Sequence, residues 1–241
     1  MKVPYLTKRH IEATTDDTIA RYERKFGCFE EPAVPLEEIA ECLYNLDVRC
    51  EDLSGEFGKD TLGAIWFNQR EIRIDDVLNH EMHPDKLGRY RFTLAHEIGH
   101  WVLHEPVFQA RLRQSSLFDV ANQPSIICRD LLLLAKKKPV EWQADYFAGC
   151  LTMPRSLVMR AFETVRGSRA PYNAADEIAC FLGRDPSPIM PTLSISREIA
   201  AALQTSAQAT QIRLIELGLI SPYQHAQGVL VPAELEAAYG S

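Results

Sequence analysis

The segment His96-Glu97-Ile98-Gly99-His100 constrains the fold of this 241-residue chain more than any other feature. On an α-helix, two histidines four residues apart lie on nearly the same face, about 6 Å apart along the axis. Their imidazoles can converge on one metal ion at about 2.0–2.1 Å each, and Glu97 lies where it can take a proton from a metal-activated water. The alternative interpretation is an ordinary helix with two hydrogen-bonded histidines.

A zinc site needs a third protein ligand and leaves a fourth position for water. His104 lies eight residues from His96, about 12 Å along a straight helix, so one ion cannot bridge the two. Glu141 and Asp145 lie four apart, on one face of a second predicted helix. Glu141 can ligate the ion while Asp145 accepts a hydrogen bond from a ligating histidine. The alternative is an amphipathic helix with two solvated acids.

The patterns of apolar residues predict an α+β fold, in which a small antiparallel or mixed sheet packs against a helical core. Alternating or apolar runs predict strands at 46–50, 62–67 and 71–75,. Helical spacing predicts helices over 14–26, from residue 35, and over 89–104, 140–151 and 194–220. We expect a peptidase domain over 1–191, with an irregular insertion or lid at 106–138, and a helical C-terminal segment over 192–241.

Composition narrows the functional classes. The formal charge of −7 disfavours a direct nucleic-acid role,. The first ten residues hold no apolar signal segment, and no apolar run is long enough to span a membrane, so we expect a soluble, cytoplasmic protein. The six cysteines form no Cys-x-x-Cys pair, so we expect reduced, buried structural thiols,.

Two longer segments resemble a known family. Arg91-Phe92-Thr93-Leu94-Ala95-His96-Glu97-Ile98-Gly99-His100, followed by Leu103-His104, resembles the zinc-binding segment of the ImmA/IrrE metallopeptidases. The run from Glu141 to Ala148, followed by Leu151-Thr152-Met153-Pro154, is similar to that family's second motif. Asp145 stands where the family usually has Asn, and the gap from His100 to Glu141 is longer than expected, which is consistent with an insertion.

The resemblance implies a cytosolic, zinc-dependent endopeptidase of the gluzincin type, with one Zn²⁺ per chain. Members of the family cut repressor-like DNA-binding proteins, often encoded nearby, and so switch on stress-response or mobile-element genes. We therefore expect a protein or peptide substrate, with a helix-turn-helix repressor as the leading candidate, and no membrane partner.

The expected chemistry assigns further roles around the ion. Glu97 would act as general base and then deliver the proton to the leaving amine. A hydrogen-bond donor in addition to the metal would help to stabilise the oxyanion of the tetrahedral intermediate. Tyr146 and His104 are the candidates for this donor, or for residues that line the cleft. The segment Ile72-Arg73-Ile74 is predicted to form an edge strand to which a substrate strand could add by main-chain hydrogen bonds,.

Two functions other than a zinc endopeptidase are alternatives. Residues 194–220 can form a helix-turn-helix, with a recognition helix carrying Gln208, Thr210, Gln211 and Arg213,. That segment holds only two cations, Arg197 and Arg213, so its attraction for phosphate is weak,. The second alternative is an inactive zinc protein that only sequesters a partner, and the presence of Glu97 argues against it.

Overall fold

The computed structural model describes residues 3–29, 32–112, 124–129, 138–182, 191–220, 224–225 and 228–229. Its contacts divide the chain into two compact units, Met1–Thr152 and Met153–Ser241. The fold is α+β, as predicted, because a mixed four-stranded sheet packs against helices in the first unit. The domain division expected after residue 191 stays a prediction.

The sheet of the first unit has the strand order β1-β3-β2-β4. Its strands are β1 (Asp47–Glu51), β2 (Thr61–Trp66), β3 (Glu71–Asp75) and β4 (Ile126–Arg129). The strands predicted at 62–67 and 71–75 form as β2 and β3, which pair antiparallel with Ala64 opposite Arg73. β1 runs parallel to β3, and β4 runs antiparallel to β2.

The prediction that Ile72, Arg73 and Ile74 form a sheet edge is wrong. β3 is hydrogen-bonded to β1 on one side and to β2 on the other. Ile72 and Ile74 are fully buried, and Arg73 is paired with Glu51 and Glu71. The alternating charges therefore reflect ion pairs within the sheet, and β3 offers no free main-chain groups to a substrate.

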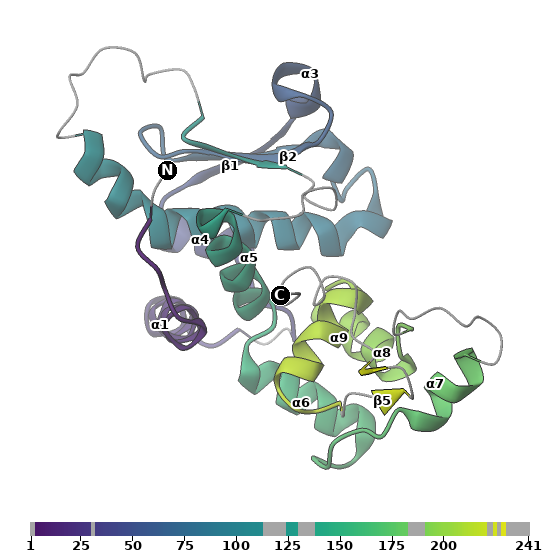
Figure 1. Ribbon diagram of the computed structural model, residues 1–241. Helices are drawn as coiled ribbons and strands as arrows, with labels where there is room; N and C mark the ends of the chain where they lie inside the picture. The colour runs from purple at the N-terminus through teal and green to yellow at the C-terminus, as the bar shows by residue number, and fades with distance from the viewer. Residues whose placement is uncertain are drawn as a thin grey trace. The chain divides into compact units, whose positions relative to one another are not determined.

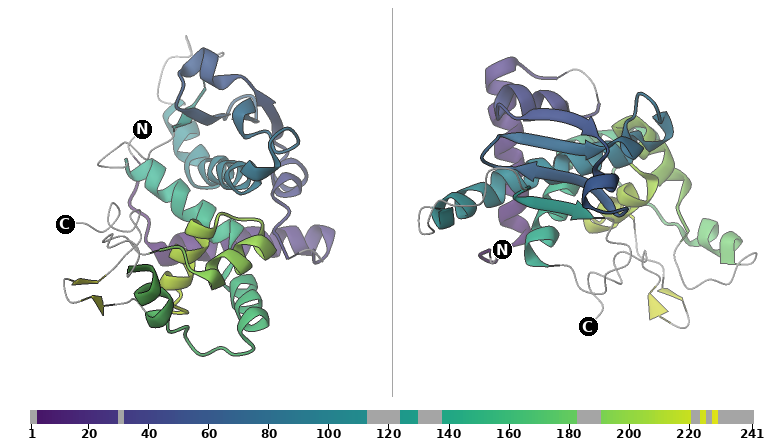
Figure 2. Two further views of the ribbon diagram at one scale, coloured as in Figure 1. Left: turned by 90° about the vertical axis from the view of Figure 1, so that its right-hand side faces the viewer. Right: turned by 90° about the horizontal axis from the view of Figure 1, so that it is seen from above.

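Helix α4 (Leu87–Leu112) lies against one face of the sheet, and α5 (Pro139–Thr152) packs on α4 (Figures 1 and 2). Alternation along β2 turns Gly63 toward α4 and turns Ala64 toward α3 (Leu53–Phe57),. Gly99 allows the helices to approach closely, because a Cβ there would lie 3.0 Å from the Phe147 ring. This packing places the two predicted metal motifs side by side.

The N-terminal helix α1 (Lys8–Phe26) packs along α5. It begins earlier than predicted, because the Thr7 hydroxyl caps it by accepting from the His10 amide, and it ends at Gly27, whose φ is +92°,. The predicted helix after Pro35 forms as α2 (Leu36–Glu38) and a π-helical turn, η1 (Ile39–Leu43). Two 3₁₀ turns, η2 (Asp76–Leu78) and η3 (Pro84–Lys86), lead into α4.

The expected irregular insertion at 106–138 is in part regular structure. α4 continues through Pro106 to Leu112, and residues 126–129 form β4. Helical periodicity was a poor guide here, since Pro106 removes one main-chain donor without ending the helix. The remainder of the insertion, apart from 124–125 and the exposed Lys138, lies outside the described residues.

The second unit is mainly helical. It contains α6 (Arg155–Arg166), α7 (Ala175–Leu182), α8 (Ser194–Leu203) and α9 (Ala207–Glu216), together with the short strands β5 (Gln224–His225) and β6 (Gly228–Val229). Gln204 ends α8 in the left-handed region with φ +54°, so the segment predicted to be helical over 194–220 is divided into two helices. None of the helices in the described ranges combines the length and apolar character that a bilayer span requires.

The expectation of six buried cysteines holds for only two of them. Cys128 and Cys150 are buried, Cys50 is half-buried, and Cys28, Cys42 and Cys180 are exposed. All six are free thiols, as expected. The exposed cysteines lie on or beside helix surfaces, where leaving a small apolar side chain in water costs little free energy. Residue type alone therefore did not predict which cysteines are buried.

Candidate metal centre

Helices α4 and α5 together form the candidate metal centre. His96 and His100 project from successive turns of α4, and Glu141 reaches them from the first turn of α5. The two Nε2 atoms lie 2.9 Å apart, and Glu141 Oε2 lies 3.3 Å from His96 Nε2 and 3.6 Å from His100 Nε2. Two ring nitrogens and one carboxylate oxygen thus form a small triangle in a buried region.

The size of this triangle suits a metal ion. Ligands about 2.0–2.1 Å from a tetrahedral zinc ion lie about 3.3 Å from one another. The three observed separations of 2.9, 3.3 and 3.6 Å lie on either side of that value. In addition, Glu141 Oε2 is buried and accepts no hydrogen bond from any described residue. A cation at the centre of the triangle would satisfy this oxygen, so the residues present are well suited to a bound metal.

Asp145 orients the first histidine. Its Oδ1 lies 2.9 Å from His96 Nδ1, on the far side of the ring from the triangle. Because a carboxylate can only accept, His96 donates through Nδ1, so Nε2 is the ring nitrogen that faces the triangle. The four-residue spacing from Glu141 therefore predicted this contact correctly.

The electrostatics of Glu141 also favour metal ligation. Burial by itself raises the pKa of this carboxyl, but the neighbouring His100 and His96 imidazoles outweigh burial and hold the pKa well below its ordinary value. Burial, together with the His96 charge, lowers the pKa of His100 to about 4. At neutral pH the site therefore presents a carboxylate and a neutral His100 imidazole, the protonation states that bind metal ions.

Glu97 lies beside the triangle with no partner of its own. Both carboxylate oxygens are buried and receive no hydrogen bond from any described residue. Burial raises the pKa of this carboxyl to about 8, although the His96 charge opposes the shift. A strongly raised pKa beside a cluster of metal-ligand type is characteristic of a proton-transferring group.

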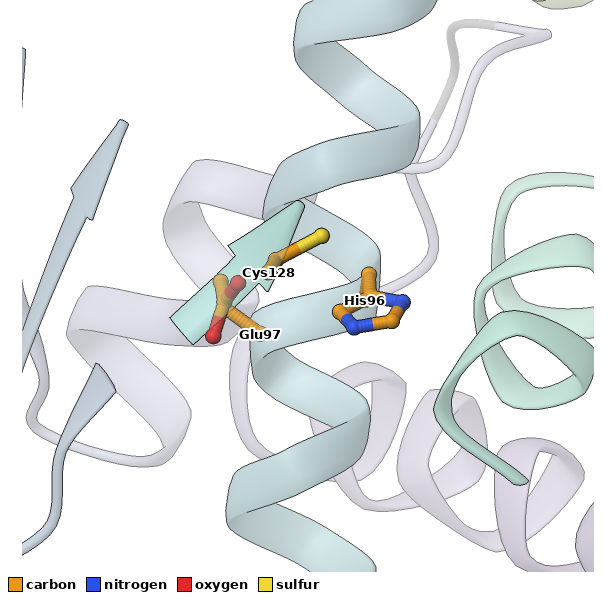
Figure 3. Close-up of side chains that lie close together, drawn as sticks. All are labelled: His96, Glu97 and Cys128. Atoms are coloured by element: carbon orange, nitrogen blue, oxygen red, sulfur yellow. The ribbon is translucent and has the colours of Figure 1, made fainter. Parts of the chain in front are cut away.

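Cys128 is a site residue that the sequence did not indicate. It lies on β4, across from Glu97 and His96 on α4 (Figure 3), and the ligand atoms of these three residues lie within 4.8 Å of one another. Burial raises the pKa of the Cys128 thiol. The residue falls within the expected insertion, so no periodicity or spacing connected it to the metal motifs.

The two candidate oxyanion donors lie in different surroundings. His104 does not line a cleft, as its side chain is fully buried and both ring nitrogens are engaged, by His100 and by Gln143. It therefore has no N–H available for an oxyanion. Tyr146 lies on α5 with its ring stacked on Trp142, and the Lys8 amino group lies 5.0 Å from the ring centroid. Its proposed role stays a prediction.

The predicted recognition helix does not present its side chains to solvent. In α9, Thr210, Gln211 and Arg213 are buried and bonded within the second unit. Gln211 contacts Leu193 and Pro191, and Arg213 donates to the Met153 carbonyl. Of the four predicted DNA-reading residues, only Gln208 is exposed. These residues therefore form packing contacts in place of a base-reading surface.

Comparison with known families agrees with this geometry. A family model of the M78 peptidases, described as the IrrE N-terminal-like domain, matches residues 77–214. The chain belongs to this family. The match covers more than half of the sequence and includes every residue of the triangle. Membership in the IrrE-like family makes the chain a peptidase with a protein substrate. A search of curated proteins finds no match.

Proposed function

We propose that the chain is a zinc-dependent endopeptidase that cuts one specific protein partner. The observation that carries this proposal is the convergence of His96, His100 and Glu141 beside Glu97, whose carboxylate has no hydrogen-bond partner among the described residues. Family membership supplies the reaction class. Two histidines with one carboxylate form a ligand set of the kind that catalytic zinc sites use, with a position left for water.

Different residues would bind the metal ion and transfer the proton. Held by His96, His100 and Glu141, zinc would supply Lewis acidity that activates water and polarises the scissile carbonyl. Glu97 takes the proton from the attacking water and delivers it to the leaving amine. Asp145 keeps the His96 ring oriented through their 2.9 Å contact. The pKa of Glu97 is raised to about 8 when no cation is nearby. A bound cation would lower this pKa toward neutral pH, because it favours the charged carboxylate.

We propose that an extended substrate segment adds to the edge of β4, since β3, the strand expected for this role, lies inside the sheet. Within the described part of the sheet, β4 pairs only with β2, so its other edge is open to an added strand. β4 also carries Cys128, which lies close to His96 and Glu97. An extended substrate segment added to this edge would run past the candidate metal centre, with main-chain hydrogen bonds fixing its register.

The partner proposed here is a helix-turn-helix repressor, with cleavage acting in stress-response or mobile-element regulation in the cytoplasm. Support for this finer assignment is the resemblance to the ImmA/IrrE peptidases described above. A role for residues 106–138 in restricting entry to the cleft stays a prediction as well.

The decisive experiment incubates the zinc-loaded chain with the repressor encoded in the neighbouring reading frame. We expect cleavage at one interdomain site, and its loss in Glu97→Gln while zinc remains equimolar by metal analysis. Casein serves as a general substrate and should be cut slowly or not at all. An active Glu97→Gln variant would contradict the mechanism, and a zinc-loaded chain that binds the repressor without cutting it would support the sequestering alternative.

A further inference from the structure

A line of buried hydrogen bonds leads from His100 to the segment that precedes α1, residues 3–7, which we call the N-terminal arm. It runs away from the metal triangle formed by His96, His100 and Glu141. His100 Nδ1 lies 2.9 Å from His104 Nδ1, and His104 Nε2 lies 3.0 Å from Gln143 Oε1. Gln143 Nε2 then donates to the Pro4 carbonyl at 2.8 Å. The three side chains are at most 1% exposed, so water does not compete for these contacts.

The far end of this line fixes the direction of every bond in it. A main-chain carbonyl can only accept, so the Gln143 amide nitrogen faces Pro4 and its oxygen faces His104,. The oxygen can only accept in turn, so His104 carries its proton on Nε2. In a neutral imidazole the other nitrogen is then an acceptor. Both hydrogen-bond partners of the His104 ring are neutral groups, an imidazole and an amide, so no hydrogen-bonded carboxylate stabilises a second proton on it,.

His100 must therefore donate to His104 through Nδ1, and its Nε2 is left unprotonated. That lone pair points at His96 Nε2, 2.9 Å away, and at Glu141. A neutral His96 is likewise unprotonated on Nε2, because it donates to Asp145 through Nδ1. When both histidines are neutral, two lone pairs and the Glu141 carboxylate face one another, an arrangement that repels unless a cation lies at its centre.

We propose that His104 and Gln143 are positioning residues, through which the Pro4 carbonyl sets the tautomer and ring orientation of the metal ligand His100. The inference deepens the proposed zinc site and rests on it. The two ligating histidines are thus held by different means, His96 by the Asp145 carboxylate and His100 by a neutral chain that ends in the backbone. Pro4 lies outside the residues that match the IrrE-like family, so the N-terminal arm adds a part of its own to the site.

The arm is fixed at more than one point. Three residues beyond Pro4, the Thr7 hydroxyl caps α1, and the amino group of Lys8 lies 5.0 Å from the centroid of the Tyr146 ring. α1 itself packs along α5, the helix that supplies Gln143 and Glu141. The carbonyl that ends the line is therefore held by a packed element, as a group that orients a metal ligand must be.

The direct test measures imidazole tautomers by long-range ¹H–¹⁵N correlation on the unaltered chain, with and without zinc. We expect His100 protonated on Nδ1 and His104 protonated on Nε2. A proton on His104 Nδ1 would overturn the proposal, because His104 would then donate to His100 and place the His100 proton on Nε2. This measurement needs no variant, so it decides the bond directions even if a substitution disturbs folding.

Zinc affinity, measured by chelator competition, tests the consequence. Loss of a residue that orients a metal ligand typically costs 10–100-fold in affinity, and we expect losses of about that size in His104→Leu and Gln143→Met. His104→Asn places an amide oxygen near the position of the original Nδ1 and should recover most of the affinity. Zinc affinity equal to the unaltered chain in His104→Leu would overturn the relay and leave the proposed peptidase intact. Failure of the unaltered chain to bind zinc would contradict the proposed function instead.

Discussion

Gly63 on β2 leaves the space that the Glu97 carboxylate occupies. A Cβ at position 63 would lie 2.9 Å from Glu97 Oε1 and 2.8 Å from the Thr93 methyl group. Atoms this close cannot stay where they are, so the Glu97 carboxylate has its position only because the facing strand lacks a side chain there. The spacing of the metal motifs gives no hint of this requirement.

Gly63→Ala should therefore reduce catalysis without removing the metal. We expect kcat to fall on the order of 100-fold, the cost of misplacing a reacting group by about 1 Å, while zinc stays equimolar by metal analysis. Gly149→Ala on α5 is the matched control, because a Cβ there meets nothing within 4 Å. Equal kcat values for the two variants would show that Glu97 does not depend on Gly63.

Asp145 should govern zinc affinity through a hydrogen bond rather than through its charge. We expect Asp145→Ala to weaken zinc binding ~10–100-fold in a chelator titration, since the His96 ring loses its acceptor. Asp145→Asn keeps an acceptor oxygen and should lie much nearer to the unaltered chain. If both variants lost affinity equally, the carboxylate charge and not the contact with His96 would be responsible.

The two groups of ligand-type residues that share His96 can be told apart. His100 and Glu141 form one group with it, and Glu97 and Cys128 form the other. We expect Cys128→Val to retain equimolar zinc, because valine suits a strand and leaves the first group complete. His100→Ala should lose tight zinc binding. The reverse result, measured by metal analysis after gel filtration, would move the metal to the β4 side of His96.

Glu97 should make the metal-free fold less stable as pH rises. Its pKa moves from 4.5 to about 8 on folding, so between these values the native state holds more protons than the unfolded state. Raising the pH through this window therefore lowers the free energy of unfolding, by at most about 1.4 kcal/mol for each pH unit. Glu97→Gln cannot titrate and should gain stability relative to the unaltered chain over the same window.

The measurement is denaturant unfolding of both proteins in chelator at several pH values. His100, whose pKa falls to about 4, acts in the opposite direction between about 4 and 6.5, but it is present in both proteins and largely cancels in their difference. A pH-independent difference between the two proteins would show that Glu97 is already charged in the metal-free fold.

The sequence alone predicted the two residue pairs of the candidate metal centre and most helices. His96 and His100, like Glu141 and Asp145, lie four residues apart, a spacing that a helix converts directly into a shared face, and the 3.6-residue period is the same in any protein. The strands β2 and β3 followed in the same way from alternating or apolar runs. Local geometry of this kind is fixed by the backbone, so it can be inferred before any tertiary contact is known.

Only the tertiary structure decided which strand lies at the edge, what surrounds Glu97, and what holds His100. β3 is central because β1 pairs with it across the chain, a contact that no local pattern encodes. Cys128, Gly63 and Pro4 reach the site from separate segments, and nothing in their own sequence surroundings marks them. Their roles depend on distances between elements, which packing sets and residue spacing along the chain does not.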